Sequence, residues 1–435
     1  MTVKYNIGDE MHGWASDLFP LCRSITGNGN RETLKYLKKI LPDMTIHEAP
    51  SGTKAFDWTV PDEWNINDAY IDNEKGNRIV DFKNSNLHVV SYSEPVDTWL
   101  SLEELDKHLY SLPDQPDAIP YVTSYYKRTW GFCLTHNQRS QLKPGKYHVV
   151  IRSTLEHGSL TYGELILKGK EEKEVLLSTY ICHPSLANNE LSGPVVTTAL
   201  ARWLNNMGSS RYTYRIVFVP ETIGSIVYLS KNLDAMKKNT IAGFVINSIG
   251  DDRAYSLTYS PWEDTLADRV AKHVLKYHVQ KHNEYFFWEK GGSDEQQYCS
   301  PNVKLPVVSV MRSRPGIYPE YHTSLDDLSL ITPEGLEGGY EVLRLCLKVL
   351  ENNCYYRVPF PCEPQMGKRG LKPLISSKNT KHPQTKMMRL LNYLDGEHDL
   401  LKVCDKIDTS LVYCIPIINE LFEKKLILLD EKPPE

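Results

Sequence analysis

The chain has 435 residues, 41% hydrophobic and 24% charged, which is the composition of a folded protein of two or three domains and excludes disordered, collagenous and coiled-coil proteins. Its formal net charge of -5 argues against a dedicated nucleic-acid-binding protein. No apolar run approaches the roughly 20 residues that span a bilayer, and the N-terminus lacks the pattern of a signal peptide, so we expect a cytoplasmic protein without membrane contact.

The first third of the chain changes character at one point. Residues 1–45 have a helical pattern, interrupted by a Gly/Asn-rich turn at 26–30. Residues 46–155 instead alternate short β-like runs, such as 55–60 and 147–151, with Pro, Gly and Asn. This pattern predicts an inserted small β-rich domain at 46–155. Two roles are expected for this domain. Either its tryptophans pack a core of its own, or the domain covers an active site and sets the choice of substrate.

Strand-like and helix-like segments alternate from residue 156 to about 355. Such alternation is typical of a mostly parallel sheet with helices on both faces. The predicted fold class is therefore α/β, with a three-layer α/β/α core made of residues 1–45 and 156–355. The predicted buried strands are 175–180, 215–219, 241–246 and 306–310, and the clearest predicted helices are 193–204 and 334–350.

The end of the chain has a separate organisation. Residues 356–383 are rich in Pro, Lys and Arg and are expected to be a linker. Residues 384–435 predict three short helices and a strand, which is the order of a winged helix. From Lys386 onward seven basic residues stand against ten acidic ones, so we expect packing or partner binding rather than DNA binding. The apolar face of the last helix suits a homodimer or an internal interface equally.

Polar clusters follow the predicted strands, where open α/β sheets form their sites. Each cluster alone also has an ordinary structural explanation, such as a helix cap or an Asp-rich turn. A carboxylate at a buried strand end, such as Glu221, is costly unless it is paired, hydrogen-bonded or metal-bound. His322 with Asp326 four residues later allows a carboxylate to orient a metal-binding imidazole. The clusters are CHPS at 182–185, NELSG at 189–193, PETIG at 220–224, NSIGDD at 247–252, GGSDE at 291–295 and EYHTSLD at 320–326.

Taken in chain order, these clusters resemble the co-catalytic zinc aminopeptidase family, whose members include leucyl aminopeptidases, glutamate carboxypeptidase II and glutaminyl cyclase. The phrases LCRSITG at 21–27 and PSGTKAFDW at 50–58 are similar to a bacterial branch of aminopeptidase-like proteins. That branch has an inserted β domain and a C-terminal winged helix, and is often found near surface-polysaccharide genes. The resemblance spans nearly the whole chain and implies an aminopeptidase-like core.

The resemblance also implies roles for particular residues. His183 and His322 match metal-binding histidines of the family. Glu221 matches the general base, Asp294 matches an Asp that lines the site, and Asp326 matches the carboxylate that supports the last histidine. These five residues are the part of the family pattern that this chain keeps.

Three carboxylate ligands of the family are replaced. Asn189 stands at the metal-bridging Asp, Thr222 at a ligand Glu and Asn247 at a ligand Asp. Without the bridge a two-zinc site is disfavoured, and a single zinc ion is expected, because histidine and carboxylate ligands with one open position form a catalytic zinc site. The expected ligands are His183, His322 and one or two of Glu190 and Glu221.

The expected activity is zinc-dependent hydrolysis of a peptide or amide bond in a small substrate, with Glu221 accepting a proton from the attacking water. Asp294 or Glu295 is expected to hold a substrate amine. Arg312, Tyr318 and Tyr321 are expected at the carbonyl or carboxylate end. The alternative is a degenerate aminopeptidase fold that serves as a binding or scaffold module, linked to surface-polysaccharide biosynthesis. A transcription regulator with a ligand-sensing α/β domain is a third hypothesis.

Overall fold

The computed structural model describes residues 6–289, 292–371 and 383–430. The chain divides into two compact units, which are described separately. The larger unit consists of residues 1–263 and 283–340, and the smaller unit consists of residues 264–282 and 341–435. Among the described residues, no helix is both long and apolar enough to cross a membrane.

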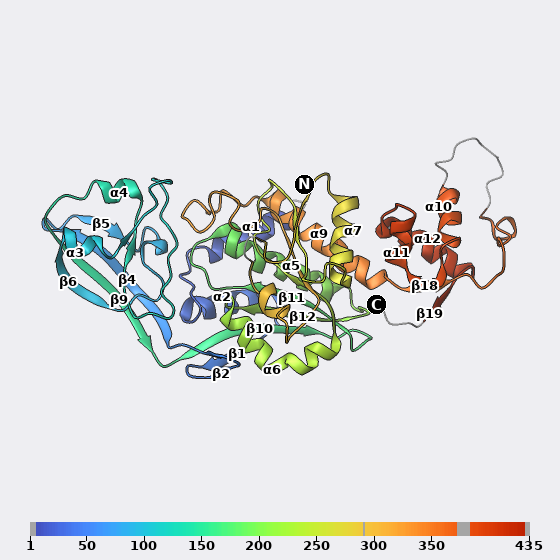
Figure 1. Ribbon diagram of the computed structural model, residues 1–435, viewed down its shortest axis with the longest axis horizontal. Helices are drawn as coiled ribbons and strands as arrows, with labels where there is room; N and C mark the ends of the chain where they lie inside the picture. Colours follow the sequence, from blue (N-terminus) through green and yellow to red (C-terminus); the bar gives the residue numbers. More distant parts are fainter. Residues whose placement is uncertain (1–5, 290–291, 372–382, 431–435) are drawn as a thin grey trace. The chain divides into compact units, whose positions relative to one another are not determined.

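An eight-stranded sheet forms the centre of the larger unit, in the order β1-β10-β12-β11-β13-β16-β14-β15 (Figure 1). Its four central strands are parallel and are, in sheet order, β12, β11, β13 and β16. Strands β1, β10 and β14 pair antiparallel with their inner neighbours. Each predicted buried strand is present at the centre, because long runs of apolar residues are stable only between two covered faces. The bounds are β1 Thr45–Pro50, β10 Ser159–Leu167, β11 Glu174–Tyr180, β12 Thr213–Val219, β13 Thr240–Val245, β14 Ser256–Thr258, β15 Asn283–Tyr285 and β16 Val307–Met311.

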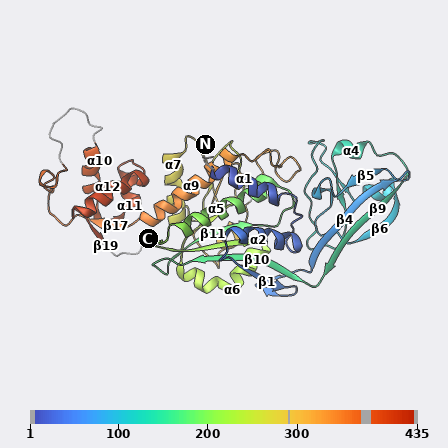
Figure 2. The same cartoon turned by 180° about the vertical axis from the view of Figure 1, so that it is seen from behind.

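Helices cover both faces of this sheet and confirm the three-layer α/β/α core. Helix α5 (Ser192–Asn206) contacts both α1 (Ile7–Leu18) and α2 (Asn28–Ile40) on one face, which the rear view shows (Figure 2). Helix α6 (Ile223–Asn239) covers the other face together with α8 (Glu295–Tyr298). Helix α5 begins very close to the sheet, because a Cβ atom at Gly193 would lie 2.4 Å from the carbonyl oxygen of Ile246.

A second, four-stranded sheet of order β5-β4-β9-β6 forms the small β-rich part of the same unit. Strand β9 ends at Glu156 and the chain re-enters the main sheet at Ser159, so the two sheets follow one another along the chain. The elements here are β2 Lys54–Ala55, β3 Trp58–Thr59, β4 Glu63–Asn73, β5 Arg78–Asp81, β6 Val96–Ser101, α3 Leu102–Asp106, β7 Leu109–Tyr110, β8 Phe132–Cys133, α4 His136–Ser140 and β9 Lys146–Glu156.

The smaller unit contains the expected winged helix together with helix α7, which lies more than 70 residues before it in the chain. Three helices and the three-stranded sheet β18-β17-β19 form the winged helix. Helix α9 (Pro333–Asn352) runs from the larger unit into the smaller one. The remaining bounds are α7 Leu266–His278, β17 Tyr355–Arg357, α10 Pro383–Leu391, β18 Asp395–Asp399, α11 Leu400–Lys406, α12 Leu411–Glu423 and β19 Leu428–Asp430.

Helix α7 is attached to the winged helix by ionic hydrogen bonds. Nη2 of Arg269 lies 2.7 and 2.6 Å from the two carboxylate oxygens of Asp399. Nδ1 of His273 lies 2.6 Å from Asp405, and its Nε2 accepts a hydrogen bond of 2.9 Å from the Leu411 amide. Asp399 also caps α11 by accepting a hydrogen bond from the Lys402 amide. One buried aspartate therefore joins a helix start to a distant helix.

Replacing Asp399 with alanine is expected to destabilise the smaller unit by about 3–5 kcal/mol, because loss of one partner leaves the guanidinium of Arg269 without its counter-charge. Urea unfolding followed by circular dichroism measures this loss. The matched control is Asp408→Ala, which removes the exposed ion pair with Lys276 and is expected to leave stability nearly unchanged. Equal stability of the two variants would show that the Arg269–Asp399 pair does not support this unit.

Candidate functional site

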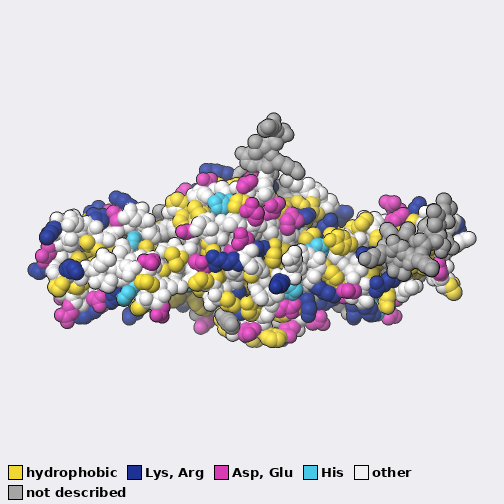
Figure 3. All heavy atoms as spheres, turned by 90° about the horizontal axis from the view of Figure 1, so that it is seen from above, with side chains coloured by type: hydrophobic (Ala, Val, Ile, Leu, Met, Phe, Trp, Pro, Cys, Tyr) yellow, Lys and Arg dark blue, Asp and Glu magenta, His cyan; other side chains and the backbone are white. Residues whose placement is uncertain are grey.

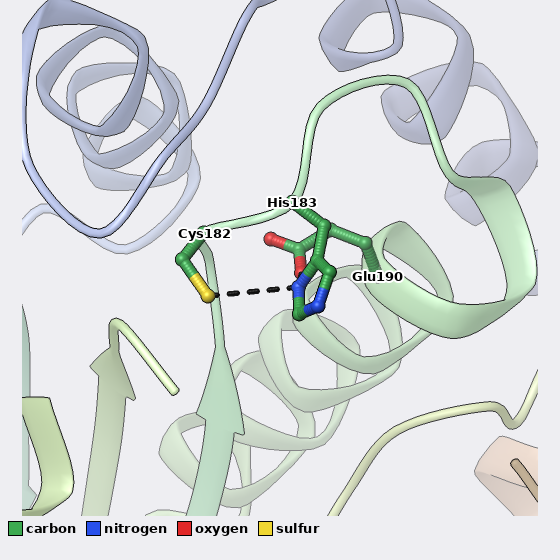
Figure 4. A group of neighbouring side chains, drawn as sticks. All are labelled: Cys182, His183 and Glu190. Atoms are coloured by element: carbon green, nitrogen blue, oxygen red, sulfur yellow. Dashed lines mark hydrogen bonds and ion pairs between the residues drawn. The ribbon is translucent and has the colours of Figure 1, made fainter. Parts of the chain in front are cut away.

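His183 lies just beyond the end of the central strand β11 and is almost completely buried, with 4% of its surface exposed. Its Nδ1 lies 2.8 Å from Oε2 of Glu190. Glu190 belongs to a single π-helical turn, Ala187–Leu191, which leads directly into α5. Figure 4 shows the Glu190 side chain reaching the imidazole from this turn. Isolated π-helical turns are frequent at functional sites because they move one side chain out of helical register.

A buried positive charge lies beside the His183–Glu190 pair. Oε1 of Glu190 lies 3.6 Å from Nε of the buried Arg23. Burial raises the pKa of Glu190, against the lowering effects of His183 and Arg23. Burial alone would lower the pKa of His183, but its hydrogen bond to Glu190 and the charges of Glu190 and Glu221 outweigh burial and raise it.

Two further side chains lie close to His183, one just after a strand and one in the segment between β16 and α9. Glu221 follows β12, and its Oε2 lies 3.7 Å from Nε2 of His183, while its Oε1 accepts a 2.6 Å hydrogen bond from the Ser293 hydroxyl. The ring of His322 lies 5.5 Å from that of His183, measured between centroids. Nε2 of His322 is buried and has no hydrogen-bond partner among the described residues. Burial and the charge of His183 lower the pKa of His322 to about 3.

These three side chains line a pocket of about 270 Å³ at the carboxyl ends of the parallel strands. Its other walls include four aromatic side chains from the β-rich part of the chain, together with residues of the α/β core. The pocket is lined by Ile25, Trp58, Tyr121, Thr123, Tyr125, Tyr126, Cys182, His183, Glu221, Thr222, Ile223 and His322.

The loop that carries Tyr121 is held over the site by backbone hydrogen bonds. The Tyr121 amide donates to the carbonyl oxygen of His322 at 2.8 Å, and the Ser324 amide donates to that of Ile119 at 2.9 Å. The ring of Tyr121 packs against both histidines, with centroids 5.1 Å from His183 and 5.2 Å from His322. Tyr121 and its neighbours from the β-rich part therefore cover the side of the pocket at which the two histidines lie.

The four tryptophans of this part also have different roles. Trp130 packs against the β-rich part's own core, whereas Trp64 is buried in the main core cluster. Trp99 is half exposed, and Trp58 lines the pocket beside Tyr126. A core of its own accounts for only one of the four.

The expected contact between Asp326 and His322 is wrong. The Asp326 carboxylate instead accepts backbone hydrogen bonds from Asn188 at 2.6 Å and Asn189 at 2.9 Å, and a third from the Tyr318 hydroxyl at 3.2 Å. The free amide groups at the start of a helical turn attract a carboxylate, which explains this choice. Asp326 thus holds the turn that carries Glu190, and Tyr318 is buried behind it rather than lining the pocket.

Arg312 is also placed differently from the expectation. Its Nε donates a 2.6 Å hydrogen bond to the carbonyl oxygen of Asp251, and its guanidinium lies over the ring of Tyr255. This arginine fixes the loop after β13, and it does not line either pocket described near the site. Arg314, two residues later, lines the neighbouring pocket.

The neighbouring pocket, of about 140 Å³, contains other residues expected at the substrate. Glu295 lines it and accepts hydrogen bonds from the Ser293 amide and the Ser309 hydroxyl. Tyr321 also lines it and stacks on His322, with ring centroids 3.9 Å apart. The two pockets are therefore separated by Tyr321 and by Ser293, the residue that bonds Glu221.

Asp294 is buried beside Glu221 rather than exposed in a pocket. Its Oδ1 accepts hydrogen bonds from the Thr222 amide at 2.7 Å and the Ser225 hydroxyl at 2.8 Å. Burial, followed by the charge of Glu221, raises the pKa of Asp294 to about 8. This carboxyl holds the loop that presents Glu221.

Cys182, His183 and Glu190 also have the spacing of metal ligands, because their ligand atoms lie within 4.8 Å of one another. We consider this group a poor cation site. The Nδ1 of His183 is already bonded to Glu190, and the positive charge of Arg23 lies beside the same carboxylate. Burial raises the pKa of the Cys182 thiol well above its ordinary value, which opposes the thiolate that metals prefer.

This three-layer core with polar residues at the carboxyl ends of its parallel strands has the fold of the zinc aminopeptidases. BSAP, a zinc aminopeptidase from Bacillus subtilis, has a TM-score of 0.59 at 11% identity, with 79% of this chain and 94% of that chain covered. A Shewanella amazonensis protein, described as a peptidase M28 precursor, has a TM-score of 0.55 at 12% identity, with 80% and 95% covered.

The family follows from closer matches. The model of the family described as "Domain of unknown function (DUF4910)" matches residues 12–353, and a winged helix-turn-helix model matches residues 354–428. The chain belongs to the DUF4910 family. A Clostridium acetobutylicum relative named "Putative polysaccharide biosynthesis protein with aminopeptidase-like domain" is 44% identical over 407 residues, 92% of this chain and 91% of the relative. A crystal structure of a "putative peptidase" from that organism has a TM-score of 0.92 at 42% identity, with 97% and 96% covered.

Proposed function

We propose that this protein is a metal-dependent hydrolase that cleaves a peptide or amide bond, with one zinc ion as its cofactor. The observation that carries the proposal is the buried Nε2 of His322, which has no partner among the described residues and belongs to a side chain that lines the same pocket as His183 and Glu221. Leaving a buried polar nitrogen without a partner costs free energy, and a metal ion would supply that partner.

One ion fits the donor set better than two. Glu190 is directed at Nδ1 of His183, on the side away from Glu221, so it supports a histidine rather than completing a second site. Asn189 donates from its side-chain amide to the Tyr180 hydroxyl, and Asn247 also offers a neutral amide. Two zinc ions would bring four positive charges to a site in which neutral side chains replace three family carboxylates.

The chain's own groups have separate roles in this proposal. A bound zinc ion would polarise the substrate carbonyl and lower the pKa of water to about 7. Glu221 accepts the proton of the attacking water and passes it to the departing amine. The Ser293 hydroxyl holds Glu221 through Oε1 and leaves Oε2 facing His183. The aromatic side chains that line the pocket, Trp58, Tyr121, Tyr125 and Tyr126, limit access of bulk water to it.

The aromatic walls narrow the class of substrate. Trp58 and Tyr126 stand edge to face with ring centroids 5.7 Å apart, and both line the pocket. Aromatic rings bind flat apolar surfaces, including the face of a sugar ring. The name of the Clostridium acetobutylicum relative refers to polysaccharide biosynthesis. Amide-bearing sugars are therefore the first substrates to screen, beside small peptides.

The winged helix supports a packing or partner-binding role rather than DNA binding. Helix α12, LVYCIPIINELFE, has no lysine or arginine and exposes Tyr413 and Phe422. On the face drawn in Figure 3, basic side chains are interspersed with acidic ones. Contact with DNA phosphates needs concentrated positive charge.

The second candidate function is a binding or scaffold module without catalysis, and the neutral residues Asn189, Thr222 and Asn247 favour it. Elemental mass spectrometry of the purified full chain separates the two. About one zinc per chain, together with zinc-dependent hydrolysis of an amide in the screen, is expected. For variants of the pocket histidines His148→Ala is the matched control, because His148, on β9, pairs with Asp97 on β6 and does not line the pocket. No bound metal after zinc supplementation would contradict the hydrolase and favour the binding module.

A further inference from the structure

Arg23 is a fully buried arginine in the loop between α1 and α2, within the LCRSITG phrase. A buried guanidinium is costly unless strong partners compensate for the loss of water. Its Nη1 donates to the carbonyl oxygen of Leu18 at 2.7 Å, and its Nε donates to that of His183 at 3.0 Å. The same Nε lies 3.6 Å from Oε1 of Glu190.

Arg23 therefore contacts His183 by two routes. The direct route holds the backbone of His183 through its carbonyl oxygen. The indirect route runs through Glu190, whose other oxygen lies 2.8 Å from Nδ1 of the imidazole. With the backbone and one ring nitrogen both fixed, the ring has one orientation, in which Nε2 faces Glu221.

This arrangement also selects the proton position on the ring. A carboxylate oxygen next to Nδ1 favours the form with hydrogen on Nδ1, and the lone pair is then on Nε2, where a metal ion would bind. The positive charge of Arg23 balances the charge of Glu190, so the carboxylate can stay buried beside the histidine.

We infer that Arg23 is a positioning residue for the metal site, fixing the orientation and proton position of His183 through Glu190 and the His183 carbonyl group. The inference rests on the proposed metal-dependent function, but it concerns a residue 160 positions away from His183 in the chain. It also accounts for the placement of an arginine in the core beside the site.

The test compares zinc affinity of the purified full chain, by competition with a chelator, for wild type, Arg23→Met and Arg23→Lys. Arg23→Met is expected to weaken zinc binding about 10–100-fold, the usual effect of losing a partner behind a ligand. Arg23→Lys keeps the positive charge but cannot reach the carbonyl oxygens of Leu18 and His183 at the same time. Its loss of zinc affinity is therefore expected to be smaller than that of Arg23→Met. The matched control is Arg202→Met, which breaks the 2.6 Å ion pair with Glu10 between α1 and α5, away from the pocket, and should leave the affinity unchanged. Wild-type affinity in Arg23→Met would overturn the inference.

A second measurement works without metal. ¹⁵N NMR of histidine-labelled, metal-free protein at alkaline pH reports which ring nitrogen carries the proton, and the signal of His183 is identified by its loss in His183→Ala. Wild type is expected to show hydrogen on Nδ1, and Arg23→Met is expected to gain the Nε2 form. Identical spectra would overturn the positioning role. A wild type that binds no zinc would instead contradict the proposed function, and the NMR comparison would still decide whether Arg23 positions His183. Arg23→Lys takes the place of Arg23→Met in both measurements if Arg23→Met fails to fold.

Discussion

Replacing His322 with alanine is expected to remove bound zinc from the protein and with it all amide hydrolysis. Nε2 of His322 is buried and has no other partner in the described part of the chain, and His322 lines the pocket, so binding metal is the role its surroundings leave for it. Loss of a direct ligand should weaken zinc binding by more than the roughly 100-fold that loss of a supporting partner causes. Elemental mass spectrometry and chelator competition give the stoichiometry and the affinity.

Two further variants keep this result interpretable. His322→Gln retains a polar side chain of similar reach and guards against simple unfolding, because His322 has a positive φ of 56° and packs on Tyr321. His148→Ala should retain wild-type zinc. Full zinc content in a folded His322→Ala variant would show that His322 is not a ligand, and the single-ion site would have to be abandoned.

Glu221→Gln is expected to reduce turnover by about 10²- to 10⁴-fold, the contribution of a general base. Glutamine keeps the size of the side chain and can still accept the hydrogen bond from Ser293, so the loop should stay in place. The change removes the ability to take a proton from water. Turnover with the best amide substrate from the screen measures this effect.

The zinc content of the same variant assigns the role of Glu221. Retained zinc with lost turnover identifies a base that is not a ligand, whereas loss of both identifies the third ligand beside the two histidines. Glu32→Gln is the matched control, because Glu32 is exposed on α2 and pairs only with Lys35 among the described residues. Unchanged turnover in Glu221→Gln would contradict the proposed mechanism.

The sheet centre could be predicted from the sequence because buried parallel strands need continuous apolar runs, and 175–180 is one of these. The outer strands β14 and β15 are three residues long, which is too short for a periodic signal. The sequence of α7 predicts an ordinary amphipathic helix. Nothing in the spacing of its apolar and polar residues indicates that its partners lie beyond residue 395. Long-range ion pairs such as that of Arg269 with Asp399 leave no local pattern.

The site residues likewise fall into those that the sequence could predict and those that depend on contacts between distant parts of the chain. Resemblance and strand-end position identified His183, Glu221 and His322, which the fold brings to one pocket. Spacing in sequence suggested that Asp326 supports His322, but the free amide groups of the turn before α5 compete for that carboxylate and bind it. Arg23 could not be assigned, because its partners His183 and Glu190 are more than 150 residues away in the chain.

The attachment of α7 has a consequence for how this protein is made. The matched families meet between residues 353 and 354, yet Arg269 and His273 find their partners about 130 residues further along the chain. During synthesis α7 therefore leaves the ribosome long before the winged helix exists, and Arg269 and His273 lack these partners until residues 399–411 have been added. A fragment that stops at residue 353 never acquires these partners, so α7 is expected to be held less firmly in it than in the full chain.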